Sequence, residues 1–357
     1  MPVPTRFAEL PGHVAERVGA GERVLLVLLD AFGMRFVQRH AGHPLLRRLD
    51  SLVPLEAQFP STTTAEMTTL HTGLPVGQHG LYEWNVYEPA LGRVITPLRF
   101  SFAGDTEPDR LAGHGFQAEQ LLPAGPTLYE RIDGPSFVYE PFGPTTYGNV
   151  ATRGAERRRY EELGDAVRDA LETLRRQERG YALVYFDRID AAGHVHGPSS
   201  PEFAAASAAA LDALDAALAD PGGVSVLLTA DHGQADVDPS RTVWLDDLHP
   251  PLGRLPLRPA GSARDVFLHV PEDEIAPALE ALGPHVEAHR VSELVDAGAF
   301  GTVGEPLRRR LATVCVLAPQ GRMAWLRTAR DHQWGFRGHH GGRTGDESRT
   351  WLGTLGG

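Results

Sequence analysis

Carboxylate and imidazole side chains follow three apolar segments whose composition is typical of buried strands. Asp30 comes after residues 23–29, Asp190 and His194 come after 181–186, and Asp231 and His232 come after 224–229. In an open α/β sheet, ligands bind at the carboxyl edge of the parallel strands, so polar groups from separate strand ends can converge there. Because carboxylates and imidazoles bind divalent metal ions, the pattern predicts a metal site at one edge of a sheet.

A histidine pair near the end of the sequence, His339 and His340, lies between glycines and adds a further candidate ligand. With His340 the set holds three carboxylates and three imidazoles, which is enough for two ions such as zinc. Taken singly, each of these residues is equally typical of a helix cap or a loop. Their shared position at strand ends favours one common site. Two metal ions can hold the attacking and leaving oxygens of an in-line displacement at phosphorus.

A candidate nucleophile lies in the segment 59–66, which reads Phe-Pro-Ser-Thr-Thr-Thr-Ala-Glu and leads into a helix expected to end at Thr72. Hydroxyl groups at a helix N-terminus usually cap the helix, and this is the simplest interpretation of the threonines in isolation. The positive potential of a helix N-terminus also stabilises a phosphate. Metal coordination would lower the pKa of the Thr63 hydroxyl enough for attack, so Thr63 is the predicted nucleophile.

Short β-rich runs at 23–29, 136–139, 181–186 and 224–229 alternate with helical patterns at 160–179 and 201–218. This alternation predicts an α/β fold with a mostly parallel central sheet and helices on both faces. Between residues 248 and 300 the pattern changes to proline-rich loops, a helix near 274–282, and strands near 265–270 and 285–290. We therefore expect a catalytic domain from 1–247 and 301–357, with 248–300 as a small inserted α+β cap.

Composition excludes several functions. The chain has 357 residues and a net charge of −12, so neither a nucleic-acid polymer nor an anionic membrane is an expected partner. All 34 basic residues are arginine, which excludes Schiff-base chemistry and a P-loop lysine. The single cysteine, Cys315, lies in an apolar run and is expected in the core. No signal peptide or membrane span is recognisable, and a cytoplasmic location is expected.

The order of these motifs resembles the type I phosphodiesterase and nucleotide pyrophosphatase family of the alkaline phosphatase superfamily. The resemblance spans residues 23–341 and is weakest between 248 and 300. The matching segments are Phe-Pro-Ser-Thr-Thr at 59–63, Leu-His-Thr-Gly-Leu at 70–74, His79-Gly80 with Asn85 and Tyr87, Asp190-x-x-Gly193-His194-x-x-Gly197-Pro198, Asp231-His232-Gly233 and His340-Gly341. This resemblance implies an alkaline phosphatase-like fold and cleavage of a phosphodiester or pyrophosphate bond in a small, nucleotide-like molecule.

The resemblance also implies the roles of individual residues. One metal ion would bind Asp190, His194 and His340, and the other would bind Asp30, Asp231, His232 and the Thr63 oxygen. Zinc is the expected ion, with manganese and iron as alternatives. Attack by Thr63 would give a covalent phospho-threonine that water then hydrolyses. His339, next to His340, is the main ambiguity in this assignment.

One departure concerns Glu66, because the family commonly has asparagine three residues after the nucleophile. A carboxylate there would repel a phosphate dianion, which favours a singly charged diester as substrate. Glu66, Asn85 and Tyr87 are the predicted substrate-binding residues, and Tyr82, Trp84 and Tyr87 are either a leaving-group pocket or core aromatics. Phosphomonoesterase, phosphonate hydrolase and phosphotransferase activities would use the same two-metal site, and a non-catalytic metal- or phosphate-binding protein is the other alternative. The sequence leaves the oligomeric state open.

Overall fold

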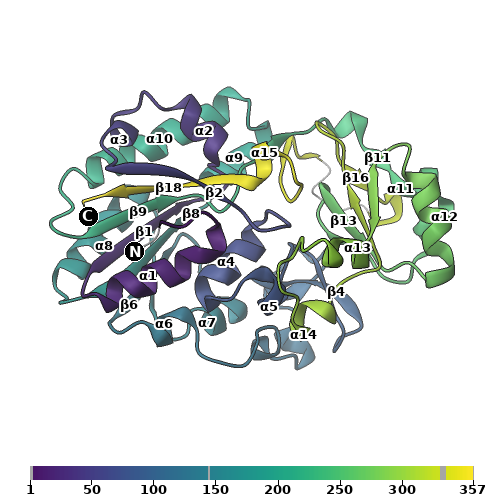
Figure 1. Ribbon diagram of the computed structural model, residues 1–357, viewed down its shortest axis with the longest axis horizontal. Coiled ribbons are helices and arrows are strands. Elements are labelled where there is room, and N and C mark those ends of the chain that lie inside the picture. The colour runs from purple at the N-terminus through teal and green to yellow at the C-terminus, as the bar shows by residue number, and fades with distance from the viewer. Residues whose placement is uncertain (1–2, 144, 330–334, 357) are drawn as a thin grey trace.

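The computed structural model describes residues 3–143, 145–329 and 335–356, and its larger lobe is built on a seven-stranded sheet (Figure 1). The strand order is β2-β18-β9-β1-β8-β6-β7, with bounds, in this order, of Ser51–Glu56, Arg349–Leu355, Ser225–Thr229, Arg23–Leu29, Gly180–Phe186, Ser136–Glu140 and Glu156–Arg159. Strand β18 runs antiparallel to its neighbours β2 and β9, and the other pairs are parallel. The predicted mostly parallel α/β sheet is therefore confirmed.

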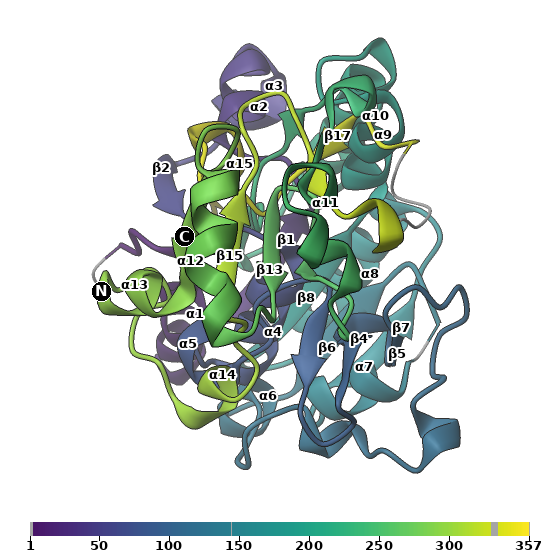
Figure 2. The same cartoon turned by 90° about the vertical axis from the view of Figure 1, so that its right-hand side faces the viewer.

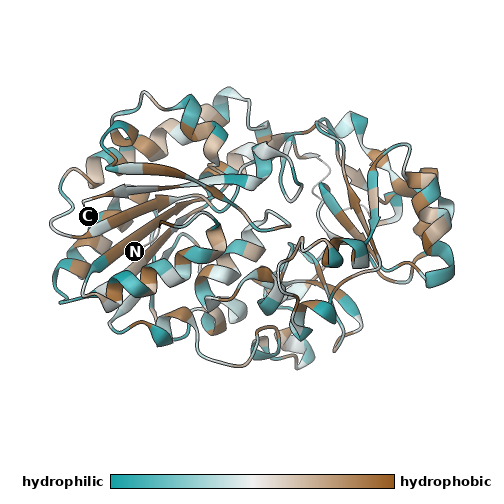
Figure 3. Ribbon diagram, viewed as in Figure 1, coloured by the Kyte–Doolittle hydropathy of each residue, from teal (hydrophilic) through white to brown (hydrophobic). Residues whose placement is uncertain are grey.

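Helices cover both faces of this sheet, as the unbroken apolar sequence of its central strands requires. Side chains 24, 26 and 28 of β1 pack with α1 (Leu10–Gly19) and α4 (Thr63–Thr72). Side chains 25, 27 and 29 pack on the opposite face with α8 (Leu163–Arg175) and α10 (Pro201–Ala217). The apolar strands form the centre of the lobe and the polar helix faces form its outside (Figure 3). This packing fixes α4 against the sheet, with its first residue, Thr63, at the carboxyl edge of the strands.

The smaller lobe is formed around a four-stranded antiparallel sheet with the order β12-β13-β15-β14 (Figures 1 and 2). These strands are Ala260–Gly261, Asp265–Leu268, Val314–Leu317 and Glu287–Arg290, in the same order. Helix α12 (Glu272–Leu282) packs on the sheet through Ile275 and Leu282. Strand β15 contains Cys315, which is buried as predicted, and it lies after residue 300. The lobe therefore takes in residues beyond the expected 248–300 insertion.

Shorter elements connect the two lobes and complete the fold of the described residues. The helices are α2 (Met34–Arg39), α3 (Pro44–Arg47), α5 (Val76–His79), α6 (Leu128–Arg131), α7 (Thr146–Ala151), α9 (Arg188–His196), α11 (Leu245–Leu248), α13 (Val291–Asp296), α14 (Glu305–Arg308) and α15 (Gly345–Ser348). The strands are β3 (Val86–Glu88), β4 (Arg93–Thr96) and β5 (Ser101–Phe102), and the pairs β10 (Ala235–Asp236) with β17 (Gly338–His339) and β11 (Val243–Trp244) with β16 (Ala324–Trp325). Within the described ranges, no helix has both the length and the apolar character needed to cross a membrane.

Candidate active site

The loops after β1 and β9, two neighbouring strands, bring Asp30, Asp231 and His232 together. One potential ligand atom from each residue lies within 4.8 Å of the others. Nε2 of His232 is 3.5 Å from Oδ1 of Asp30 and 3.4 Å from Oδ2 of Asp231, and all three side chains are buried. The strand-end positions predicted from the sequence thus place two carboxylates and one imidazole at a single point.

A second group forms beside the first from Asp190, His194 and His340, with the same 4.8 Å spacing. Asp190 and His194 are one turn apart on α9, which follows β8, and their Oδ2 and Nε2 atoms are 3.2 Å apart. His340 follows β17, and its ring stacks on His232 with the ring centres 3.9 Å apart. The neighbouring His339 is buried and lies outside both groups, and its ring nitrogens have no hydrogen-bond partner among the described residues.

The three histidines of these groups are oriented by backbone carbonyl oxygens. Nδ1 of His194 is 2.8 Å from the carbonyl of Gly338, and Nδ1 of His232 is 2.9 Å from that of Gly233. Nδ1 of His340 is 3.2 Å from the carbonyl of Ser61. A carbonyl oxygen only accepts, so Nδ1 carries the hydrogen in each neutral ring and Nε2 keeps a lone pair. Each Nε2 is therefore free to bind a metal ion, as in other metal sites.

Thr63 lies against the first group, at the first position of α4. Its Oγ1 is 3.3 Å from Oδ2 of Asp30 and 3.1 Å from Nε2 of His232. The side chain of Thr62 accepts a hydrogen bond from the backbone N–H of Ala65, so Thr62 caps the helix. With that role already filled, the Thr63 hydroxyl faces the carboxylate and imidazole groups.

The site gathers buried carboxylates whose negative charges repel one another. Burial and the negative charges of Asp231 and Asp190 raise the pKa of Asp30 well above its usual range. Burial also raises the pKa of Asp231, and burial together with the neighbouring imidazoles lowers that of His340. Oδ2 of Asp231 has no hydrogen-bond partner within the part of the chain that the structure describes. Divalent cations would supply the missing positive charge, so these residues fit a metal centre.

Two residues outside the predicted set orient the candidate ligands. Tyr185, on β8, donates a hydrogen bond from its hydroxyl to Oδ2 of Asp30. Nε2 of Gln234 donates to Oδ1 of Asp190 at 2.9 Å. The sequence places Tyr185 in an apolar strand, and nothing in that strand's pattern indicates that its hydroxyl forms a hydrogen bond inside the site. Gln234 directly follows Asp231-His232-Gly233, and this position next to a ligand motif could have marked it as a residue of the site.

A hollow of about 180 Å³ opens onto Thr63 and the second group. Its lining residues are Thr62, Thr63, Thr64, Trp84, Asp190, His194, Ser262, Phe336, His339 and His340. Trp84 and Phe336 supply aromatic surface, and the ring of Phe336 is 4.6 Å from that of His194, centre to centre. The arrangement places the Thr63 hydroxyl, the group of Asp190, His194 and His340, and an apolar wall around one small space.

Comparison with known proteins identifies the family. The model of the type I phosphodiesterase / nucleotide pyrophosphatase family matches residues 24–303. This chain belongs to that family. It is a phosphodiester hydrolase of nucleotide pyrophosphatase type, from a metal-dependent family, and the resemblance seen in the sequence is confirmed.

Solved structures of family members share the fold. Murine ectonucleotide pyrophosphatase/phosphodiesterase 5, as an inactive variant in complex with AMP, superposes with a TM-score of 0.68 at 15% identity, covering 94% of this chain and 88% of that one. A second structure of the murine protein superposes with a TM-score of 0.68 at 16% identity, covering 93% of this chain and 88% of that one. The human protein superposes with a TM-score of 0.68 at 17% identity, covering 93% of this chain and 87% of that one.

The three residues predicted to contact substrate lie elsewhere. Glu66 is buried and accepts hydrogen bonds from the backbone N–H and the side-chain amide of Gln58, away from the hollow. Asn85 is buried, accepting from Thr96 and donating to the Gly261 carbonyl. Tyr87 packs on the His269 ring in the smaller lobe. The Glu66 carboxylate, which departs from the family pattern, therefore does not line the hollow at Thr63.

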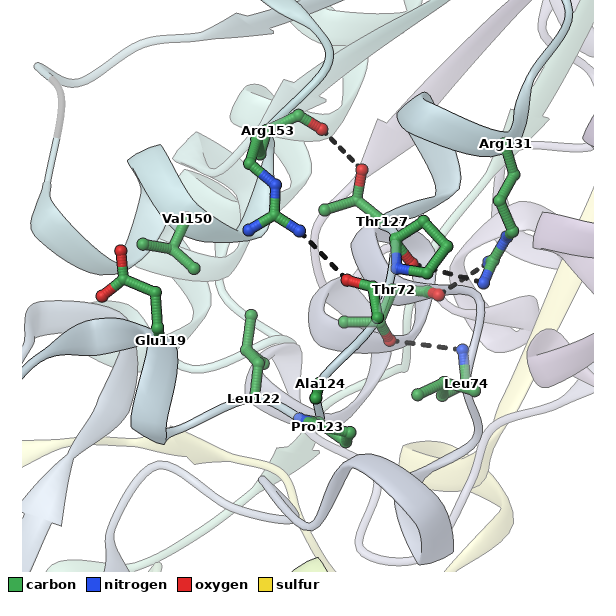
Figure 4. A pocket seen from close by; sticks show the side chains of 12 residues that line it. Thr72, Leu74, Glu119, Leu122, Pro123, Ala124, Thr127, Arg131, Val150 and Arg153 are labelled. Atoms are coloured by element: carbon green, nitrogen blue, oxygen red, sulfur yellow. Dashed lines mark hydrogen bonds between the residues drawn. The ribbon is translucent and has the colours of Figure 1, made fainter.

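A larger hollow, of about 410 Å³, lies at the opposite end of α4 (Figure 4). Its two arginines are already engaged by the protein. Arg131 donates to the Thr72 carbonyl at 2.7 Å, and Arg153 donates to the Gly125 carbonyl and to Glu130. Neither candidate metal group borders it. The smaller hollow at Thr63 is therefore the candidate active site.

Proposed function

We propose that this chain hydrolyses a phosphodiester or pyrophosphate bond of a small nucleotide-like molecule, with zinc in both residue groups and Thr63 as the nucleophile. The position of the Thr63 hydroxyl carries the proposal, since it lies within 3.4 Å of Asp30 and His232 at a helix N-terminus. The inactive murine relative is a threonine-to-alanine variant in complex with AMP, which supports the choice of threonine and of a nucleotide.

Asp30, Asp231 and His232 would hold one zinc ion, and Asp190, His194 and His340 the other. When bound, the ions supply Lewis-acid stabilisation of charge on the phosphoryl oxygens. The carboxylate of Asp30 accepts the hydroxyl proton of Thr63 as Oγ1 attacks phosphorus. A phosphorus–oxygen bond to Thr63 forms, and the bond to the leaving group breaks. Water then attacks the same phosphorus and releases a proton. The phosphorus–oxygen bond to Thr63 breaks, and Asp30 returns its proton to the threonine oxygen.

The lining of the hollow supports a diester rather than a monoester. Its described residues include no arginine, so no protein cation there would offset the second negative charge of a monoester dianion. A diester carries a single charge and leaves room for two substituents. Trp84 and Phe336 offer ring faces on which a nucleobase can stack, which supports a nucleotide-like leaving group.

The test pairs metal analysis with hydrolysis of bis-p-nitrophenyl phosphate and p-nitrophenyl phosphate, before and after chelation. The proposal expects about two zinc ions per chain, chelator-sensitive cleavage, and faster turnover of the diester. Thr63→Ala should remove turnover and keep the metal content of the wild-type protein. A preference for the monoester would overturn the choice of substrate, and an active Thr63→Ala variant would overturn the choice of nucleophile.

A further inference from the structure

Glu347, on the short helix α15, contacts both of the loops that supply candidate metal ligands. Its backbone carbonyl accepts a hydrogen bond of 2.8 Å from the N–H of Gly233, the residue after His232. Its Oε1 accepts one of 3.0 Å from the N–H of Gly342, two residues after His340. The side chain is fully buried and belongs to neither metal group. One residue therefore spans the two ligand-bearing loops.

Both loops need glycine at these contacts. A Cβ atom on Gly342 would lie 2.8 Å from both carboxylate oxygens of Glu347, and one on Gly233 would lie 2.2 Å from the carbonyl oxygen of Asp346. Such approaches are closer than a side chain tolerates. The glycines that flank the ligand histidines thus let the backbone pack directly against α15.

The carboxylate of Glu347 is held in turn by Arg264, which lies between β12 and β13 of the smaller lobe. Nε and Nη2 of Arg264 donate to Oε1 and Oε2 at 2.9 and 3.0 Å, a two-pronged geometry that fixes both partners in orientation. Nη1 donates to the carbonyl oxygens of Pro319 and Arg322. Both side chains of the ion pair are 1% exposed or less.

Burying an ion pair contributes little to stability, because desolvation offsets the attraction between the charges. The geometry points to a different role. We infer that the Arg264–Glu347 pair is a positioning device that fixes the His232 loop and the His340 loop relative to each other. Through this pair, Arg264 of the smaller lobe would raise the metal affinity of the two ligand groups although the smaller lobe contributes no ligand itself. The inference rests on the proposed function, since it assumes that the two groups hold metal.

A second buried ion pair provides a matched control. Arg310 and Glu88 are also 1% exposed or less, with Nη2 and Oε2 2.7 Å apart. Arg310 donates further to the carbonyl oxygen of His79, and Glu88 accepts from the backbone of Ala90. None of these contacts involves a candidate metal ligand or the residue next to one. Breaking this pair removes a comparable buried charge contact whose hydrogen-bond partners among the described residues include no member of either metal group.

The experiment compares Glu347→Gln with Glu88→Gln in the full-length protein. For each, zinc affinity is measured by competition with a chelator of known affinity, and the thermal midpoint of the chelated protein is measured separately. We expect both variants to lower the midpoint. We expect only Glu347→Gln to weaken zinc binding, by about 10- to 100-fold, the usual range for residues that orient ligands. Arg264→Lys keeps the charge but not the two-pronged geometry and should give an intermediate loss.

Equal zinc affinity in Glu347→Gln and the wild-type protein would overturn the inference, as would an equal loss in Glu88→Gln. If Glu347→Gln does not fold, Arg264→Lys decides, and wild-type affinity in that variant overturns the inference. A wild-type protein that binds no zinc in the same titration would instead refute the proposed function. The two failures are therefore distinguishable.

Discussion

The hydroxyl of Tyr185 hydrogen-bonds to Oδ2 of Asp30 across two neighbouring parallel strands. Tyr185 is paired in register with Leu28 of β1, and Asp30 lies two residues after Leu28, just beyond the end of that strand. Burial raises the pKa of Tyr185 well above its usual range, and so does the negative charge of Asp30, so the phenol stays protonated and donates. Because this hydrogen bond occupies Oδ2 of Asp30, Oδ1 is the oxygen that faces His232, and it lies 3.5 Å from Nε2 of His232.

Replacing Tyr185 with phenylalanine is expected to lower kcat/KM for a diester by about 10- to 100-fold and to weaken zinc binding in the same range, because Asp30 loses its fixed orientation. The ring still fills its place in the core, so the thermal midpoint of the chelated protein should change little. Zinc titration and steady-state kinetics measure the effect. Unchanged zinc affinity would show that Asp30 is oriented without the phenol.

Replacing Trp84 with alanine is expected to raise KM for thymidine 5′-p-nitrophenyl phosphate by about 10-fold, because stacking of a base on an aromatic ring contributes roughly 1–3 kcal/mol. KM for methyl p-nitrophenyl phosphate, which carries no base, should stay the same. Tyr82→Phe is the control, since Tyr82 lies in the core and outside the hollow. Equal effects on both substrates would mean that Trp84 shapes the site rather than binds a base.

Glu66 gives a pH prediction. Burial raises its pKa to about 8, whereas an unfolded glutamate titrates near 4.5. The folded state therefore holds the proton more tightly, and this residue's contribution to stability is lost as pH rises from about 4.5 to 8. Between pH 5 and 8 the free energy of unfolding should therefore fall less in Glu66→Gln than in the wild-type protein. The difference between the two losses should be on the order of 3 kcal/mol.

Denaturant unfolding at several pH values measures this slope. Glu280→Gln is the control, because Glu280 is exposed on α12 and should leave the slope unchanged. A Glu66→Gln variant with the wild-type slope would show that Glu66 is ionised throughout this range.

Chelation is expected to lower the thermal midpoint, since the two buried carboxylates of Asp30 and Asp231 lose their counter-ions and ligand binding no longer favours the folded state. The loss should grow as pH rises. Both carboxyl groups have raised pKa values in the folded, metal-free chain, so protonation stabilises that chain at low pH only. Adding zinc back should restore the midpoint, and a midpoint insensitive to chelator would contradict a metal centre at these residues.

The positions of the strand-end ligands could be predicted because each follows an apolar run that fixes where its strand ends. The predicted strand 23–29 matches β1, and those at 181–186 and 224–229 differ from β8 and β9 by one residue. Strand β18 was not predicted. Its antiparallel place between β2 and β9 depends on long-range pairing, which no local pattern in residues 349–355 encodes.

The substrate contacts were the least predictable part of the site. A motif gives the distance along the chain between Thr63 and Glu66 but not the direction of the Glu66 side chain. That direction depends on Gln58, which offers two N–H donors from a loop outside the helix. Trp84 and Asn85 are neighbours, yet only Trp84 lines the hollow, because Asn85 is bonded to Thr96 and Gly261.

The late position of His340 and β18 in the chain has a consequence for biosynthesis. A nascent chain that ends before residue 338 contains five of the six candidate ligands, Asp30, Asp190, His194, Asp231 and His232, but lacks the sixth. It also lacks the strand that pairs with both β2 and β9, so β9, an inner strand of the complete sheet, stays unpaired on one side until β18 emerges from the ribosome. Open strand edges pair readily with other chains. Truncated forms of this enzyme are therefore expected to aggregate rather than accumulate as half-loaded metalloproteins.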